Sequence, residues 1–281
     1  MSILENDIPD IVYHYCSTET MMKIFESRYL LGSINTSMND FTDSSWWYHI
    51  LVSRAEKILN SENEKKLDEF INHIFININD YYINSFSKNN DILSQWRNYA
   101  DDGRGVSIGF YTNLICKNKS IPVMSDLDEL NKGWVEIKYD EEEQNRLADV
   151  ILKAVVETDS NIYLSSNFTQ YLLSCKNPAF IEENEIRYVE VLDSRSLMNP
   201  DCPSMRTLFP GDCFEYKYKD GKGIIAQRKH YYNINVENEL KIHSITFGPK
   251  CVNDLKSFNL FANKFRINRE IMLLRSKATY S

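Results

Sequence analysis

The chain has 281 residues, of which 43% are hydrophobic and 26% charged, a balance that is typical of a folded globular protein and excludes a largely disordered one. Its net charge of −8 disfavours extended non-specific contact with a nucleic-acid backbone but allows a local basic site. No stretch has the pattern of a signal peptide or of a bilayer-spanning helix, so we expect a cytoplasmic protein without a membrane partner.

Hydrophobic spacing predicts a mixture of helices and strands in the first half of the chain. A strand at 11–16 is followed by a helix that Ser17 caps and that Gly32 ends. The further elements expected here are two helices at 45–60 and 62–79 that pack as a hairpin, a strand at 81–86, a helix at 92–100 and a strand at 105–111.

The second half continues this mixture. The expected elements are a strand at 134–139, helices at 141–157 and through 171–174, a helical turn that leads into a strand ending at 191, a hairpin of 214–218 with 224 onward, a strand at 241–247, a helix at 252–264 and a strand at 270–274. Asp220-Gly221 supplies the turn of the hairpin. Without repeats or proline-rich linkers, residues 1–281 are predicted to form one α+β domain with helical insertions near 45–80 and 141–175.

The segment 94–110 is the most informative part of the sequence. It brings Trp96, Arg97, Tyr99 and Arg104 together around Gly103-x-Gly105. Guanidinium groups bind phosphate oxygens and stack on flat rings, so Arg97 and Arg104 are candidate phosphate ligands and Tyr99 a candidate stacking residue. We expect Trp96 to belong to the core. The segment therefore favours a nucleotide ligand.

A second group of charged residues begins a predicted strand. Glu183, Glu185 and Arg187 alternate, and alternate residues of an extended strand lie on one face. A carboxylate on such a face can stabilise the oxocarbenium-like sugar that forms when a glycosidic bond breaks. The same spacing is also typical of a solvated row of ion pairs with little energetic weight. The residues alone leave both interpretations open.

His14 alternates with Tyr13 and Tyr15 on the first strand. A half-buried core histidine is one interpretation. The other is a ligand contact, because the helix capped by Ser17 begins nearby and offers backbone N–H groups to an anion.

Three groups of motifs resemble a bacterial family catalogued as domain of unknown function 2971, and the resemblance extends over nearly the whole chain. They are Tyr13-His14-Tyr15-Cys16-Ser17 with Asn39-Asp40, then Ser85-Phe86-Ser87 with Ser94-Gln95-Trp96-Arg97-Asn98-Tyr99 and Gly105-x-x-x-Gly109-Phe110, then Lys176-Asn177-Pro178-Ala179-Phe180 with Glu183-x-Glu185-x-Arg187 and Ile245-Thr246-Phe247-Gly248-Pro249-Lys250.

The opening strand and helix with a histidine also resemble ADP-ribosyltransferase folds, which include toxins that modify DNA. This resemblance implies a split sheet with peripheral helices, and NAD as the substrate without a metal. By its implication Glu185 or Glu183 is catalytic, and His14, Tyr15, Ser17, Arg97, Tyr99, Arg104 and Arg187 bind the cofactor. A clean serine-threonine-serine motif is absent, which leaves nucleic acid, another protein or water open as the acceptor.

The leading hypothesis is an NAD-dependent ADP-ribosyltransferase that acts as a bacterial toxin or antiphage effector, with an antitoxin or chaperone as a plausible partner. The alternative is a non-catalytic module that binds a nucleotide or ADP-ribose. A third interpretation is a nucleic-acid enzyme in which Glu183 and Glu185 hold a magnesium ion.

Overall fold

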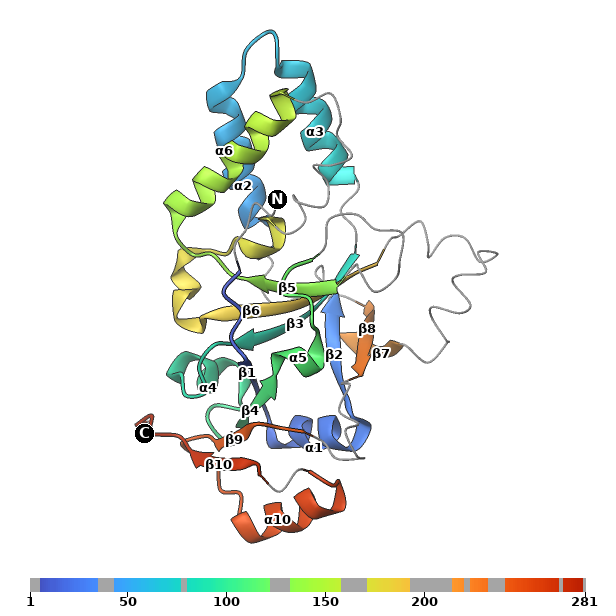
Figure 1. Cartoon of the computed structure of the whole chain (residues 1–281), viewed down its shortest axis with the longest axis vertical. Coiled ribbons are helices and arrows are strands. Elements are labelled where there is room, and N and C mark those ends of the chain that lie inside the picture. Colours follow the sequence, from blue (N-terminus) through green and yellow to red (C-terminus); the bar gives the residue numbers. More distant parts are fainter. Residues whose placement is uncertain are drawn as a thin grey trace, which may run out of the picture.

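In the part of the chain that the structure describes, ten strands form one mixed, mostly antiparallel sheet with helices around it (Figure 1). The fold is seen in a computed structural model and is described for residues 6–34, 43–76, 80–121, 132–157, 171–192, 214–219, 223–231, 241–267 and 270–279. The predicted mixed α and β single domain is confirmed within these ranges.

The elements follow one another in mixed order. The strands are β1 Ile11–Cys16, β2 Tyr29–Ile34, β3 Asp80–Ser87, β4 Val106–Tyr111, β5 Lys132–Glu136, β6 Glu185–Leu192, β7 Phe214–Lys219, β8 Gly223–Tyr231, β9 Ser244–Phe247 and β10 Met272–Arg275. The helices are α1 Thr18–Ser27, α2 Asp43–Ile58, α3 Glu64–Ile76, α4 Leu93–Tyr99, α5 Thr112–Ile115, α6 Glu141–Glu157, the short 3-10 helix η3 Pro178–Glu183 and α10 Leu255–Lys264.

The sheet forks at β3. One edge of β3 pairs with β6 along its whole length, and β6 carries β5 on its far side. The other edge of β3 pairs with β2 through Ile83 and Tyr82 and with β1 only at Ser87. One branch continues as β1-β4-β9-β10 and the other as β2-β8-β7. The described strands thus form one forked network.

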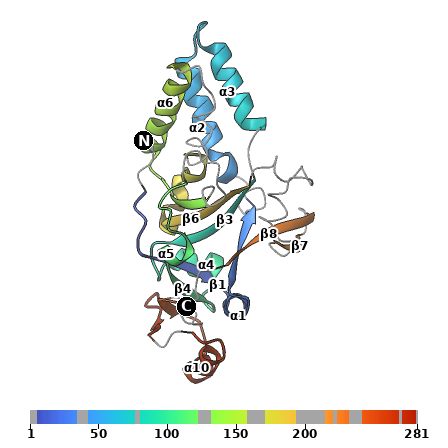
Figure 2. The same ribbon diagram turned by 45° about the vertical axis from the view of Figure 1, so that its right-hand side comes forward.

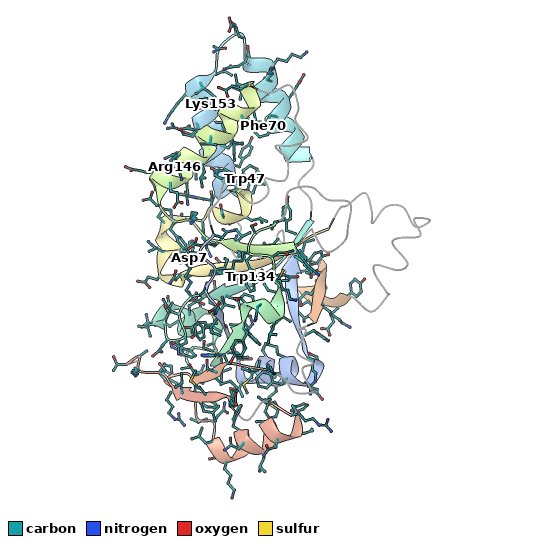
Figure 3. The ribbon with its side chains drawn as sticks, viewed as in Figure 1. Asp7, Trp47, Phe70, Trp134, Arg146 and Lys153 are labelled. Atoms are coloured by element: carbon teal, nitrogen blue, oxygen red, sulfur yellow. The ribbon has the colours of Figure 1, made fainter. Side chains whose placement is uncertain are left out.

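The two largest of the four hydrophobic clusters among the described residues lie at different places in the molecule. The larger one packs α1 and α10 against the branch that contains β1 and β4, with Phe25, Phe86 and Trp134 at its centre. The other is helical and joins α2, α3 and α6 through Trp47, Phe70 and their neighbours. Figures 2 and 3 show this helical part at the opposite end of the molecule from α10, beyond the edge formed by β5 and β6.

Most predicted elements are present, and the clearest error concerns Gly32. The helix capped by Ser17 is confirmed as α1, but it ends at Ser27, where Arg28 takes a left-handed φ of 61°. The residues that follow, Gly32 among them, form strand β2, which the sequence did not predict. The helix at 141–157 is confirmed as α6. In place of a simple hairpin, α2 and α3 each pack against α6.

The described cysteines are thiols. Cys16, Cys116, Cys175 and Cys251 are buried and unpaired, and burial raises the pKa of Cys16 to about 12. Cys202 and Cys213, like Asn39 and Asp40, lie outside the described residues. In the ranges that the structure covers, no helix is both long and apolar enough to cross a bilayer.

Candidate functional site

The register of β3 with its neighbours decides which predicted site residues share a face. Ser87 lies opposite Glu185, and Ser85 opposite Arg187. On its other edge Ser87 lies opposite Tyr13 of β1. Residues directly opposite each other on neighbouring strands have side chains on the same face. We call this side of the sheet the carboxylate face.

Four buried ionisable side chains form a cluster at this face, and we call it the charged cluster. Its members are Lys176, Glu183, Glu185 and Arg187, each at most 5% exposed. Lys176 Nζ lies between the two carboxylates, 2.5 Å from Glu183 Oε2 and 2.9 Å from Glu185 Oε2. Two positive and two negative groups therefore balance one another within the interior.

Arg187 completes the pairing of Glu185. Its Nε donates to Glu185 Oε1 at 2.8 Å and its Nη2 to Glu185 Oε2 at 3.1 Å, a two-pronged arrangement that suits the planar guanidinium. Burial by itself raises the pKa of Glu185, but the charges and hydrogen bonds of Arg187 and Lys176 outweigh it and hold that pKa well below the usual range. Glu185 is therefore an anion at neutral pH.

Lys176 is positioned by the backbone around it. Its N–H donates to the carbonyl of Lys138, next to a short parallel bridge between Lys138 and Cys175. The carbonyl of Lys176 accepts from Gln144 Nε2 of α6 at 2.8 Å. The backbone of Lys176 is thus held by Lys138, which follows β5, and by Gln144 of α6, and these contacts position the ammonium group.

Glu183 reaches the cluster from η3, and the prediction that it shares a strand with Glu185 is wrong. The 3-10 helix is capped by Asn177, whose side chain accepts from the N–H of Ala179. Asn184 then takes a left-handed φ of 45°, and strand β6 begins only at Glu185. The carbonyl of Glu183 accepts from Ser87 Oγ at 2.8 Å, which fixes the turn to β3.

Tyr99 connects the charged cluster to the surface. It is the last residue of α4, which packs against η3, and its hydroxyl donates to Glu183 Oε1 at 3.0 Å. The side chain is 44% exposed, whereas Tyr139, which accepts from the N–H of Glu185, is buried and has a raised pKa because of that burial. Of the two glutamates, Glu183 is therefore the one that is hydrogen-bonded to a half-exposed side chain.

The two arginines of the segment 94–110, Arg97 and Arg104, have different surroundings. Arg97 is exposed on α4, two residues before Tyr99. Arg104 lies beyond the helix, within 3.4 Å of Asp101 and 3.8 Å of Asp102. Arg97 thus shares the helix of Tyr99, whereas Arg104 pairs with the carboxylates of its own turn.

His14 lies on the opposite face of the sheet from Glu185, because it neighbours Tyr13 in a strand whose side chains alternate. Its imidazole sits at the fork. Nδ1 lies 3.2 Å from the carbonyl of Ser85 and must donate to it, so neutral His14 presents Nε2 as an acceptor. The ring packs edge-on against Phe86, and burial lowers the pKa of His14.

Tyr15 and Ser17 have contacts that fix the local structure. The Tyr15 hydroxyl donates to the carbonyl of Asn89 and accepts from the N–H of Ile92, and its ring packs against buried Trp96, which confirms Trp96 as a core residue. Ser17 Oγ caps α1 by accepting from the N–H of Thr20.

The structure thus brings together Tyr99, Glu183, Glu185 and Arg187, and adds Lys176. Sequence reasoning gave Lys176 no role, although the segment Lys176-Asn177-Pro178 carried a signal: asparagine and proline are typical of a helix start. Such a start folds the lysine back toward the two glutamates. Its ammonium lies where the magnesium hypothesis requires an ion, and no group of three or more potential metal-ligating side chains occurs within the described ranges.

Comparison with known proteins gives one match. Residues 95–188, about a third of the chain, match the model of a family described as "Protein of unknown function (DUF2971)". No curated protein and no solved structure matches the chain, so the comparisons give no support to the resemblance to ADP-ribosyltransferases. The matched segment includes Tyr99 and the whole charged cluster, and the chain is therefore similar, over the part that builds this site, to the DUF2971 family.

Proposed function

We propose that the chain is an ADP-ribosyltransferase that uses NAD as its substrate, with the reacting sugar at the Tyr99 side of the charged cluster. The observation that carries the proposal is the convergence of two buried carboxyl groups on Lys176, with one of them hydrogen-bonded to a half-exposed tyrosine. Loss of nicotinamide leaves a positively charged sugar, and a fixed carboxylate stabilises it.

Within this proposal, each residue takes a role that its contacts support. Glu183 faces the sugar because its Oε1 is bonded to Tyr99, while Glu185 is enclosed by Lys176 and Arg187 and positions the lysine. The ring of Tyr99 stacks on nicotinamide or the acceptor, and Arg97 on the same helix contacts the phosphates. His14 contacts a ribose hydroxyl only if the nucleotide reaches the fork between β1 and β2.

The proposal also includes the biological setting that the resemblance implies. The protein then acts in the cytoplasm as a toxin or antiphage effector on a nucleic-acid or protein acceptor, and an antitoxin or chaperone restrains it.

The test is release of nicotinamide from NAD by the purified protein, with and without cellular RNA, DNA and protein. We expect release by the wild type, and at least a hundredfold less from Glu183→Gln, because one well-placed electrostatic contact contributes about that factor. Tyr99→Phe keeps the ring and removes the hydroxyl, so it distinguishes the contribution of stacking from that of the hydrogen bond to Glu183. Lys153→Ala is the control, since Lys153 is exposed on α6 far from the cluster (Figure 3).

A second function is favoured by one specific observation. Every carboxylate oxygen of Glu183 and Glu185 accepts a hydrogen bond, and four of the five bonds come from cations. Such a balanced cluster suits a module that binds NAD or ADP-ribose without turnover. Calorimetry combined with the nicotinamide assay distinguishes the two functions. Binding of NAD or ADP-ribose without nicotinamide release supports the module, and release that depends on Glu183 supports the enzyme. The absence of both binding and release overturns both proposals.

A further inference from the structure

Strand β7 exposes two aromatic rings at the end of the sheet. It is the last strand of its branch and pairs only with β8 in the strand order of the described residues. Tyr216 is 70% exposed and Tyr218 is 73% exposed. Neighbouring exposed aromatic side chains are typical of binding surfaces.

Both rings lie on one face of β7, because they are two residues apart. They are opposite Ala226 and Ile224 in the register of the hairpin. The other face is tied to the rest of the sheet, since the Tyr29 hydroxyl of β2 hydrogen-bonds to Glu215 and Gln227 Nε2 donates to Ser33 Oγ at 3.3 Å. The tyrosines are therefore carried by a strand whose position is fixed.

The hairpin is basic, although the chain is acidic. Residues 214–231 contain five basic side chains and two acidic ones, a balance of +3 in a chain of net charge −8. The basic residues are Lys217, Lys219, Lys222, Arg228 and Lys229, and the acidic residues are Glu215 and Asp220. Lys217 is exposed between the two tyrosines in sequence.

We propose that β7 is a stacking platform for single-stranded nucleic acid. Two residues along a strand span about 7 Å, roughly twice the about 3.4 Å rise of a stacked polynucleotide, so each ring can hold one base of an extended strand. Aromatic rings bind the faces of bases without regard to sequence. Lys217 alternates with the tyrosines and lies on the other face of β7, so it neutralises phosphates that pass around the open edge of this strand. The pairing of exposed tyrosines with local positive charge is the combination that such a ligand requires.

The same observations disfavour a second copy of the chain as the occupant. Lysines on an edge strand hinder pairing with another strand, and Lys217 and Lys219 belong to this edge. Two hairpins brought together would also place like charges side by side. A polyanion meets neither obstacle. This inference concerns binding alone and does not depend on the turnover of NAD.

The experiment is fluorescence anisotropy with labelled single-stranded DNA and RNA of about 15 nucleotides, a length that spans one such platform. The wild type is expected to bind at low salt and to lose affinity as salt rises. The double variant Tyr216→Ala/Tyr218→Ala should bind at least tenfold more weakly, whereas Tyr216→Phe/Tyr218→Phe should bind like the wild type because the rings remain.

A matched control uses the opposite end of the sheet. Met272 and Leu274 are exposed on edge strand β10, and their replacement by alanine should leave the affinity unchanged. Absence of binding by the wild type, or equal binding by the alanine variant, overturns the proposal. So does light scattering that shows a dimer which the tyrosine variants convert to a monomer while oligonucleotide affinity stays constant. NAD is absent from this assay, so a negative binding result would not count against the proposed transferase activity. That activity is tested separately by the release of nicotinamide.

Discussion

The ammonium group of Lys176 lies between the buried carboxylates of Glu183 and Glu185 and offsets the electrostatic repulsion between them. It also lies 5.0 Å from the centre of the Phe180 ring, a favourable place for a cation. Removing one partner of a buried ion pair leaves a charge in the interior, which costs far more than the loss of a surface pair. The stability of the site should therefore depend strongly on this one side chain.

Replacing Lys176 by methionine is expected to lower the free energy of unfolding by about 3–5 kcal/mol, because Glu183 loses its buried counter-ion. Urea unfolding followed by tryptophan fluorescence measures the change. Lys153→Ala, which breaks only an exposed pair with Glu157, should change it by less than about 0.5 kcal/mol. Adding Glu183→Gln to the methionine variant should restore part of the loss. A loss below about 1 kcal/mol would show that the cluster is hydrated.

The lowered pKa of Glu185 predicts a pH dependence of stability with a defined sign. Since the carboxyl group loses its proton more easily in the folded protein, its contribution is fully present above the unfolded pKa of about 4.3 and is lost as the pH falls through the folded value. Unfolding measured between neutral pH and about pH 3 should show this fall for the wild type. Glu185→Gln, less stable at neutral pH, should show a shallower fall; parallel curves would refute the assignment.

At the scale of elements, the sequence predicts best where one local signal is strong. The helix α6 has regular apolar spacing and three acidic residues in its first turn, and its predicted bounds are those observed. The alternating residues of 214–218 and 224 onward predict the pairing of β7 with β8, which is observed, whereas the Asp220-Gly221 turn lies outside the described residues. Strand β2 was missed because Gly32 looked like a helix stop, although the helix ends earlier through the left-handed Arg28. A non-glycine residue in that conformation has no clear sequence signal.

The turn between α4 and β4 requires glycine at position 105, because a side chain would not fit there. A Cβ on Gly105 would lie 2.2 Å from the carbonyl oxygen of Cys16 and 2.9 Å from that of Ala100. Both atoms belong to the backbone and cannot rotate away. Gly105→Ala should therefore cost about 3 kcal/mol of unfolding free energy or more, measured by denaturant unfolding. Asn98→Ala, at an exposed position of α4, serves as the control, and an equal effect of both variants would contradict the steric explanation.

At the scale of the whole molecule, the candidate site could be predicted only in part. The grouping of Glu183, Glu185 and Arg187 follows from sequence proximity, and it is confirmed. Their burial was not predictable, because Lys176 reaches them through the cap of η3. The separation of His14 from Glu185 depends on the register of β1, β3 and β6, and strand order over such distances leaves no trace in local spacing.

The pairing of β4 with β9 also has a consequence for synthesis on the ribosome. Val106 of β4 lies opposite Phe247 of β9, which is 141 residues further along the chain. At about 5–20 residues per second, roughly 7–28 s separate the translation of the two partners. During that interval the edge of β4 that later pairs with β9 is open, and so is its apolar face. We therefore expect a nascent chain of this protein to bind holding chaperones until its last strands emerge.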